Sequence, residues 1–139
     1  MRVTAEEADA PGTQPSFFTT PGLQAAAEDL TKSDWSSARD KADAALAADK
    51  KSSEAWLVLG RAQLGAGQTK KALSSFNKAL KRDPHYAAAY YWKGKAFESR
   101  GKLDEAANEY QAAFHADAKL EAARNAWKRL SDRVTLPDS

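Results

Sequence analysis

The sequence predicts an all-α fold in which three helix hairpins stack side by side and one more helix covers the last hairpin. Apolar residues recur three and four positions apart, as they do on the buried face of an amphipathic helix. This pattern repeats after a constant number of residues, equal to the separation of Trp56 and Tyr90 in the sequence. We call this separation one period. Equivalent helix pairs therefore follow one another along the chain. Glycines separate the two helices of the clearest pair and Pro84 follows the second, which places a turn and a stop where a hairpin needs them.

Residues 1–19 are expected to form a disordered leader, because Pro11, Gly12 and Pro15 interrupt them and no helical or strand spacing is sustained. Phe17 and Phe18 are the exception in this segment. Loose packing is the favoured interpretation of these two aromatic residues, and docking on the first helix or binding a partner are the alternatives.

The first hairpin is predicted over residues of about 20–52. Thr20 followed by Pro21 is typical of a helix start. The apolar stripe of the first helix is formed by Leu23, Ala26, Ala27 and Leu30. This stripe lies one residue late in the periodic frame, which indicates either a unit that is one residue shorter or a slightly rotated helix. The second helix is in frame, and Trp35 is expected to cover the turn between the two helices.

The second and third hairpins are predicted over residues of about 53–86 and 87–120. Six positions of the second find counterparts one period later, and the pairs are Trp56 and Tyr90, Gly60 and Gly94, Gln63 and Phe97, Ala72 and Ala106, Phe76 and Tyr110, and Ala79 and Ala113. Small residues would let the helices of a hairpin approach closely, and aromatic residues would fill the space between hairpins. Asp49, Asp83 and Asp117 recur between units, where a carboxylate can accept backbone N–H groups, so we interpret them as structural.

A final helix is predicted over residues of about 118–133 from a stripe at helical spacing, formed by Leu120, Ala123, Trp127 and Leu130. Because no partner helix follows it in the sequence, we expect it to cap the exposed face of the third hairpin. Residues 134–139, which include Pro137, are expected to be a disordered tail. Residues 20–133 are thus the one predicted domain.

The order of residues in the second hairpin resembles the tetratricopeptide repeat, whose usual pattern is a large apolar residue, Leu-Gly, an aromatic residue, Ala, Phe, Ala and Pro. Every position of this pattern except one holds a residue of the usual type in the second hairpin. The exception is Gln63, which stands where an aromatic residue is usual. The resemblance covers residues of about 20–133. It implies a right-handed α-solenoid that acts as a protein-interaction module, with a concave groove lined by the first helices of the units.

The resemblance also implies that the second, fifth, ninth and twelfth residues of each unit face this groove. The candidate peptide-binding residues are Leu57, Arg61, Leu64, Tyr91, Lys95, Glu98, Asn125 and Arg129. Arg61, Lys95 and Arg129 are spaced one period apart, so a stacked array would place three cations in a row. Such a row can pair with acidic side chains or a terminal carboxylate of a partner, and ordinary solvated charge is the alternative interpretation.

One subclass of this family binds the acidic C-terminal tails of heat-shock chaperones through a two-carboxylate clamp of Lys, Arg and Asn residues. In this sequence the clamp positions hold Leu23, Ala27, Val58, Ala88 and Trp92, none of which matches. A chaperone tail is therefore disfavoured as the partner.

Composition argues against catalysis and against several classes of ligand. The chain has no cysteine and two histidines, His85 and His115, which fall at unit ends without a cluster of partners. We expect no catalytic site, no metal site and no cofactor. The net charge of +2, with acidic residues among the lysines, disfavours nucleic acid. Because no apolar run reaches the ~20 residues of a membrane span and no secretory signal is evident, we expect a cytoplasmic protein without membrane insertion.

The predicted function is that of a scaffold, adaptor or co-chaperone-like module that binds a peptide or helix of a protein partner, with acidic groups favoured. Two alternatives are a module that assembles homo-oligomers and a regulatory domain cut from a larger enzyme. A monomer or weak homo-oligomer is expected, and burial of Trp127 within one chain would favour a capping role over assembly.

Overall fold

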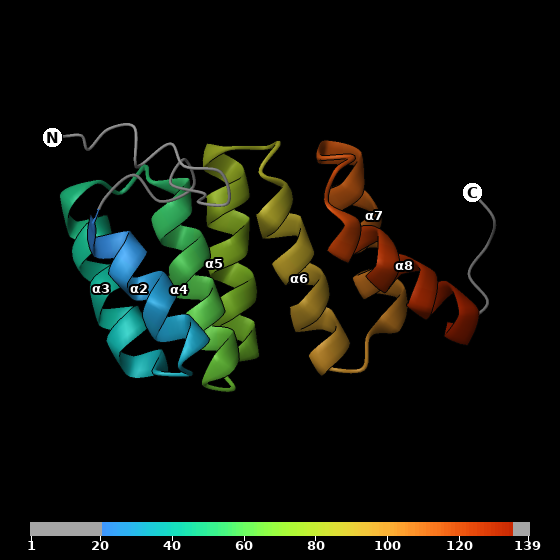
Figure 1. The fold of residues 1–139 in the computed structure, drawn as a ribbon, viewed down its shortest axis with the longest axis horizontal. Coiled ribbons are helices and arrows are strands. Elements are labelled where there is room, and N and C mark those ends of the chain that lie inside the picture. Colours follow the sequence, from blue (N-terminus) through green and yellow to red (C-terminus); the bar gives the residue numbers. More distant parts are fainter. Residues whose placement is uncertain (1–20, 135–139) are drawn as a thin grey trace, which may run out of the picture.

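The computed structural model describes residues 21–134, and the seven helices of this part of the chain form a row (Figure 1). They are α2 (Pro21–Thr31), α3 (Trp35–Ala48), α4 (Ser53–Gly65), α5 (Thr69–Arg82), α6 (Ala87–Ser99), α7 (Leu103–Ala116) and α8 (Glu121–Val134). Because residues 21–134 contain no strand, the all-α helical repeat fold is confirmed. The expected leader over residues 1–19, the Thr20 cap and residues 135–139 lie outside the described residues.

The helices pair into three hairpins, α2 with α3, α4 with α5, and α6 with α7, and α8 packs on α7. Successive hairpins are joined through α3 against α4 and α5 against α6. The first helices of the hairpins also touch one another, α2 against α4 and α4 against α6. They therefore form one layer of the stack, along which one ligand can contact several units.

The turn inside each hairpin keeps the same backbone pattern at intervals of one period. Three N–H groups donate to the carbonyl five residues earlier, and the pairs are Asp34 to Asp29, Gln68 to Gln63, and Lys102 to Phe97. The residue before each donor has a positive φ, 60° at Ser33, 85° at Gly67 and 76° at Gly101. The first unit therefore keeps the full period, which argues against a unit that is one residue shorter.

Burial along α2 follows the same frame as along α4. Leu23 and its equivalent Leu57 are 1% and 2% exposed, and Leu30 is 6% exposed whereas its equivalent Leu64 is half-buried. The facing helix α3 offers Ala42 at the position where α5 carries a phenylalanine. The first hairpin therefore has no large ring at this position of its core, and Leu30 is buried more deeply than Leu64.

Small residues and aromatic rings meet in the second and third hairpins, as expected. Phe76 and Tyr110 are fully buried, and their rings lie against Gly60 and Gly94 of the preceding helices. A Cβ atom added at Gly94 would lie 2.6 Å from the Tyr110 ring, closer than real Cβ contacts. The close approach of the two helices therefore requires glycine at these positions.

Trp35 begins α3, and its position corrects the expectation that it covers the turn of its own hairpin. Its ring lies against Gly65 at the end of α4, where an added Cβ atom would overlap the ring atoms. The reason is that α3 packs against α4 and the first turn of α3 meets the last turn of α4, where glycine leaves room for the ring. Trp35 thus links two successive units.

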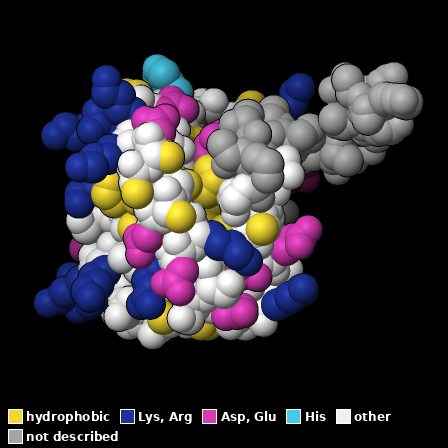
Figure 2. Space-filling view, turned by 90° about the vertical axis from the view of Figure 1, so that its left-hand side faces the viewer, with side chains coloured by type: hydrophobic (Ala, Val, Ile, Leu, Met, Phe, Trp, Pro, Cys, Tyr) yellow, Lys and Arg dark blue, Asp and Glu magenta, His cyan; other side chains and the backbone are white. Residues whose placement is uncertain are grey.

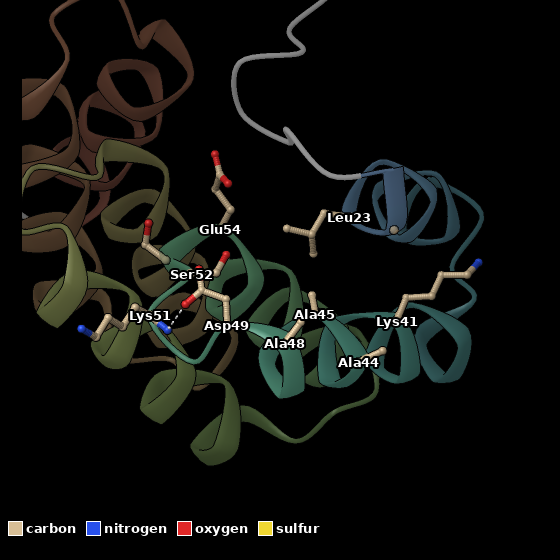
Figure 3. Close-up of a pocket in the computed structure, with 11 residues that line it drawn as sticks. Leu23, Lys41, Ala44, Ala45, Ala48, Asp49, Lys51, Ser52 and Glu54 are labelled. Carbon is tan, nitrogen blue, oxygen red and sulfur yellow. Dashed lines mark hydrogen bonds between the residues drawn. The ribbon is translucent and has the colours of Figure 1, made fainter.

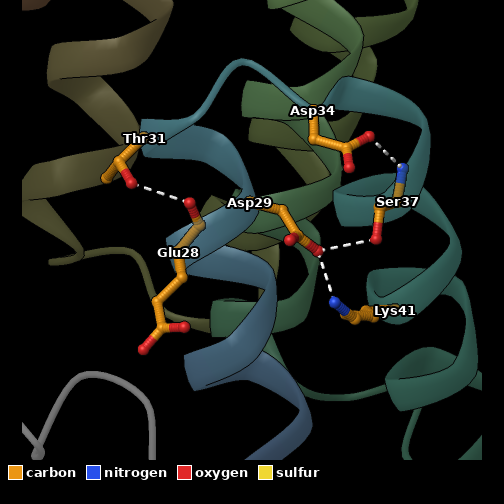
Figure 4. Close-up of polar contacts among 6 residues, drawn as sticks. All are labelled: Glu28, Asp29, Thr31, Asp34, Ser37 and Lys41. Carbon is orange, nitrogen blue, oxygen red and sulfur yellow. Dashed lines mark hydrogen bonds and ion pairs between the residues drawn. The ribbon is translucent and has the colours of Figure 1, made fainter.

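Hydrogen bonds between polar side chains link the two helices of the first hairpin (Figure 4). Asp29 of α2 accepts hydrogen bonds from Lys41 over 2.5 Å and from the Ser37 hydroxyl over 2.8 Å, and the bond from Lys41 is the main cause that lowers the pKa of Asp29. At the same positions of the second hairpin, the Ser75 hydroxyl donates to Gln63 over 2.6 Å. This bond explains why an amide, and not an aromatic ring, occupies position 63.

The three recurring aspartates have the structural role expected of them. Each ends the second helix of a hairpin, and its carboxylate accepts the N–H group two residues later, in the pairs Asp49 and Lys51, Asp83 and His85, and Asp117 and Lys119. The bonds lie within the loops between units. The start of the next helix is capped separately in one case, where the Ser52 hydroxyl accepts the N–H group of Ala55.

The final helix, α8, lies on α7 as the expected cap. Ala123 and Leu130 are fully buried, and Trp127 is half-buried with its ring 6.0 Å from that of Phe114 on α7. The two rings meet edge to face at 75°, an arrangement that aromatic pairs prefer. Trp127 therefore finds its main partner within the same chain.

Candidate functional site

Two adjoining cavities lie along the layer of first helices. The first, of about 180 Å³, is lined by Leu30, Trp35, Arg61, Leu64, Gly65 and Trp92. The second, of about 360 Å³, is lined by Leu64, Lys95, Glu98 and Ser99. Leu64 belongs to both, so the cavities are adjacent, and "the groove" below means the lining residues of both, which lie on α2, α3, α4 and α6.

Arg61 of α4 is the central cation of the groove. The carbon atom of its guanidinium group lies 4.3 Å from the centroid of the Trp92 ring on α6, within the range of a cation–π contact. Its Nε atom is buried and has no hydrogen-bond partner among the described residues. Burial lowers the pKa of Arg61, although a guanidinium remains charged at neutral pH. The stacking holds the charged group flat at the wall of the first cavity.

The hydroxyl of Tyr86 is a second buried donor without a described hydrogen-bond partner. Tyr86 stands just before α6 and is 8% exposed. Burial raises its pKa, the nearby carboxylates of Glu54 and Asp83 raise it further, and Arg61 opposes the shift. The junction of α4 and α6 thus holds two buried donors without a described partner, the Arg61 Nε atom and the Tyr86 hydroxyl, which favours a hydrogen-bond acceptor there.

Lys95 supplies the second cation, one turn along α6. Its Nζ atom lies 5.9 Å from the centroid of the Tyr91 ring and forms no ion pair with any residue in 21–134. Tyr91 in turn contacts the rings of Trp92 and Tyr110, at centroid distances of 5.4 and 5.6 Å. The groove therefore combines a cationic strip with an aromatic wall.

Arg129 of α8 does not extend this strip as a free charge. Its guanidinium donates to both carboxylate oxygens of Glu98 over 2.6 and 3.2 Å, and the Tyr110 hydroxyl donates to the same carboxylate over 2.7 Å. The bonds from Arg129 are the main cause that lowers the pKa of Glu98. Of the three cations expected in a row, Arg61 and Lys95 form no ion pair within residues 21–134, whereas Arg129 pairs with Glu98.

The structure brings together only part of the expected peptide-binding set. Arg61, Leu64, Lys95 and Glu98 line the groove. Leu57 is 2% exposed and packs in the core with Phe76, and Asn125 is exposed on α8 outside both cavities.

Five groove residues were not among the predicted binding residues, namely Leu30, Trp35, Gly65, Trp92 and Ser99. Leu30 stands one period before Leu64, so a strict periodic frame for the first helix would have found it. Trp92 occupies the sixth position of its unit, where Val58 is fully buried one unit earlier. A tryptophan at that position is too large for the same core and is the signal that could have been used. Nothing in the sequence indicates that Trp35 reaches the next unit.

Within residues 21–134, no group of three or more His, Cys, Asp or Glu side chains is arranged to hold a metal ion. In the same part of the chain, none of the helices combines the length and the apolar character needed to cross a membrane.

Stacked helix hairpins with a groove along their first helices define an α-helical repeat protein. The sequence matches the tetratricopeptide repeat family over residues 23–76 and again over residues 57–120. The chain belongs to this family, whose domains are protein–protein interaction modules.

Comparison with a curated relative gives a partial match. The chain is 29% identical over 79 residues to "Protein bimA" of Emericella nidulans, which covers 57% of this chain and 9% of that protein. The chain thus spans less than a tenth of the length of this relative.

Solved structures share the fold at low sequence identity. The first TPR of Spaghetti (RPAP3), bound to the HSP90 peptide SRMEEVD, has a TM-score of 0.74 at 19% identity, over 83% of this chain and 91% of that one. The TPR2B domain of yeast Sti1, in a complex with pHsp70, has a TM-score of 0.71 at 20% identity, over 82% and 99%.

Proposed function

We propose that this chain is a scaffold or adaptor that binds a peptide of a partner protein in the groove, with an acidic side chain or a terminal carboxylate held by Arg61 and Lys95. The observation that carries the proposal is the stacking of Arg61 on Trp92 at 4.3 Å, with a buried Nε atom that lacks a partner. A guanidinium held in one orientation loses little freedom when it binds a carboxylate.

The apolar part of the groove supports a ligand that alternates acidic and apolar residues. Leu30, Leu64 and Trp92 surround the first cavity beside the Arg61 guanidinium. A leucine-sized side chain placed there would bury apolar surface, while an adjacent carboxylate reached Arg61 or Lys95. The Glu98 carboxylate, already bound to Arg129, marks the end of the cationic strip.

We infer a partner other than a chaperone tail held by a two-carboxylate clamp. The structures of RPAP3 and Sti1 contain an HSP90 peptide and pHsp70, respectively. In this chain, two of the expected clamp positions hold Leu23 and Val58, which are 1% and 0% exposed. Apolar core residues cannot bind a carboxylate, which supports a different mode of recognition.

We also infer that α8 acts as a cap and that the chain is a monomer or a weak homo-oligomer. The contact of Trp127 with Phe114 inside one chain supports the cap. The alternative in which this helix drives assembly has no comparable observation in its favour.

The proposal is tested by selecting peptides from a random display library with the full chain and measuring the affinity of the enriched peptides. We expect enriched peptides to contain Asp or Glu next to a large apolar residue. The Arg61→Glu, Lys95→Glu double variant should weaken their binding at least tenfold, about 1.4 kcal/mol. Higher salt should also weaken binding, because the cations are partly exposed.

The matched control is the Lys70→Glu, Lys71→Glu double variant, which reverses two exposed charges on α5, away from the groove. It should bind like the unmodified chain, and circular dichroism should show equal helicity for all variants. If the groove variant lost helicity, Lys95→Glu alone would replace it. Enrichment of peptides without acidic residues, or equal loss of binding in both double variants, would refute the proposal.

A further inference from the structure

A further cavity among the described residues lies apart from the groove, at the junction of the first two hairpins (Figure 3). Its volume is about 520 Å³, and its walls include Leu23 of α2, Ala45 and Ala48 of α3, and Ser52 and Glu54 at the start of α4. Figure 3 shows Leu23 pointing towards Ala45 and Ala48 across the opening. We call this cavity the junction pocket.

The equivalent space at the next junction is filled by an aromatic ring. Tyr86, which precedes α6, is 8% exposed and belongs to one core cluster with Leu57 and Ala79. One period earlier, the corresponding residues are Ser52, Leu23 and Ala45, all of which line the junction pocket. The backbone arrangement that encloses a tyrosine ring at the second junction encloses a serine at the first.

At two further positions of the junction pocket, the side chains are smaller than those at the equivalent positions one unit later. In the second hairpin, the Trp56 indole donates to the carbonyl of Lys50, in the loop before α4, over 3.0 Å, and its ring lies 4.7 Å from the Lys78 ammonium of α5. The residues one period earlier are Gly22 and Ala44, which also line the pocket. A Cβ atom added at Gly22 would meet nothing within 4 Å. Small residues therefore line the pocket at three positions where the next unit carries Tyr86, Trp56 and Lys78.

The pocket opens where the first hairpin carries apolar surface. Ala44, Ala47 and Ala48 are exposed on α3. Figure 2 shows this end of the stack, where hydrophobic side chains lie among acidic and basic ones and most Lys and Arg residues gather at the margins. An apolar pocket beside exposed apolar residues is a site that an aromatic side chain can enter with a gain in buried area.

We propose that the junction pocket binds an aromatic side chain and that its occupant is the Phe17-Phe18 pair of this same chain. These are the only aromatic residues among residues 1–20. Phe18 stands four residues before Gly22, which already lines the pocket, and an extended chain of this length spans about 13–14 Å.

Tethering favours this occupant over a separate partner. A segment joined to the pocket by four residues is present there at an effective concentration that a free ligand does not reach. Weak contacts of the two phenylalanine rings are then sufficient to occupy part of the pocket. The bound segment would complete the first junction in the way that Tyr86 completes the second.

The proposal is tested by replacing Phe18 with the photo-crosslinking residue p-benzoylphenylalanine in the full chain and by mapping the crosslinks with mass spectrometry. We expect crosslinks within one chain to the segment of residues 41–54. The Ser52→Tyr substitution should fill the pocket, as Tyr86 does at the next junction, and abolish this crosslink. Ala47→Tyr is the matched control, because Ala47 is an exposed residue of α3 outside the pocket, and the crosslink should persist.

Thermal unfolding provides the second measurement. The Phe17→Ala, Phe18→Ala double variant should lower the Tm by several degrees in the unmodified chain and leave it unchanged in the Ser52→Tyr background. If Ser52→Tyr failed to fold because the bond from Ala55 to the Ser52 hydroxyl is lost, Ala48→Trp would fill the pocket from its opposite wall.

Three results would overturn the proposal. The first is a crosslink to other parts of the chain or none at all. The second is a crosslink that forms only between chains, which would assign the pocket to a second copy. The third is an equal change in Tm in both backgrounds, which would show that the two phenylalanines stabilise the chain without entering the pocket.

Discussion

Arg129 of α8 binds Glu98 of α6 through two hydrogen bonds of 2.6 and 3.2 Å, and so connects the capping helix to the end of the groove. The residues are 31 positions apart in the sequence, and α7 lies between their helices along the chain. The same carboxylate accepts the hydroxyl of the buried Tyr110. The cap therefore stabilises the third hairpin and also removes one cation from the groove.

The Arg129→Ala variant is expected to lose stability in a pH-dependent way. The pKa of Glu98 is lowered in the folded state, mainly by its bonds to Arg129. Its contribution is therefore present above the unfolded pKa of about 4.3 and is lost as the pH falls below it. At pH 7 we expect a loss of up to about 1 kcal/mol, because the pair is partly exposed.

Urea unfolding at pH 7 and at pH 3 measures this effect. The difference between Arg129→Ala and the unmodified chain should shrink as the pH falls to about 3, because the unfolded chain then holds a proton that the Glu98 carboxylate releases on folding. Arg133→Ala, at an exposed position in the last turn of the same helix, is the control and should show no comparable pH dependence. A difference that is equal at both pH values would contradict the proposed linkage.

Tyr110→Phe is expected to lower the free energy of unfolding by about 1–2 kcal/mol, because the Tyr110 hydroxyl donates over 2.7 Å to an ionised carboxylate. The reciprocal variant, Phe76→Tyr, should also destabilise the chain. The position equivalent to Glu98 in the second hairpin is Leu64, which has no acceptor atom in its side chain. The new hydroxyl at position 76 would therefore be buried without the carboxylate that Tyr110 has. Chemical denaturation of both variants checks the pair, and a neutral effect of Tyr110→Phe would show that the bond contributes nothing.

Gly94→Ala is expected to destabilise the third hairpin by about 1–3 kcal/mol through overpacking. The added Cβ atom would lie 2.6 Å from the fully buried ring of Tyr110, which cannot move freely. Gly22→Ala is the matched control, because its Cβ atom meets nothing within 4 Å and alanine favours the helix. Its Tm should be unchanged or higher, and a similar loss in both variants would argue against the steric explanation.

Ser33→Gly is expected to stabilise the chain by about 0.5–1 kcal/mol. Ser33 has a φ of 60°, whereas the equivalent turns use Gly67 and Gly101 at 85° and 76°. Glycine adopts this left-handed region without the steric cost that serine bears. Ser36→Gly, at an exposed position inside α3, should instead lower the Tm, and a gain in both variants would point to a cause other than the backbone conformation.

The periodicity of the sequence was enough to predict the helices and their pairing, because a helix buries one face and the residues of that face must recur three and four positions apart. Gly60 and Gly94 predicted the close approach of the two helices in the second and third hairpins, which the structure confirms. The first hairpin was harder to predict. Ala42 stands where the other two hairpins carry an aromatic residue, so the repeat could not be aligned there on an aromatic position. The groove residue Leu30 was therefore overlooked.

The sequence by itself determined the architecture of this protein and indicated four of the residues that line its groove, namely Arg61, Leu64, Lys95 and Glu98. Only the tertiary structure decided which charges remain free, since Arg61, Lys95 and Arg129 are equivalent in spacing but differ in their neighbours. Trp92 stacks on the first, none of the described acidic residues pairs with the second, and Glu98 binds the third. These differences depend on distances between helices of different units, and a repeat pattern constrains the positions of residues without constraining the partners across the stack.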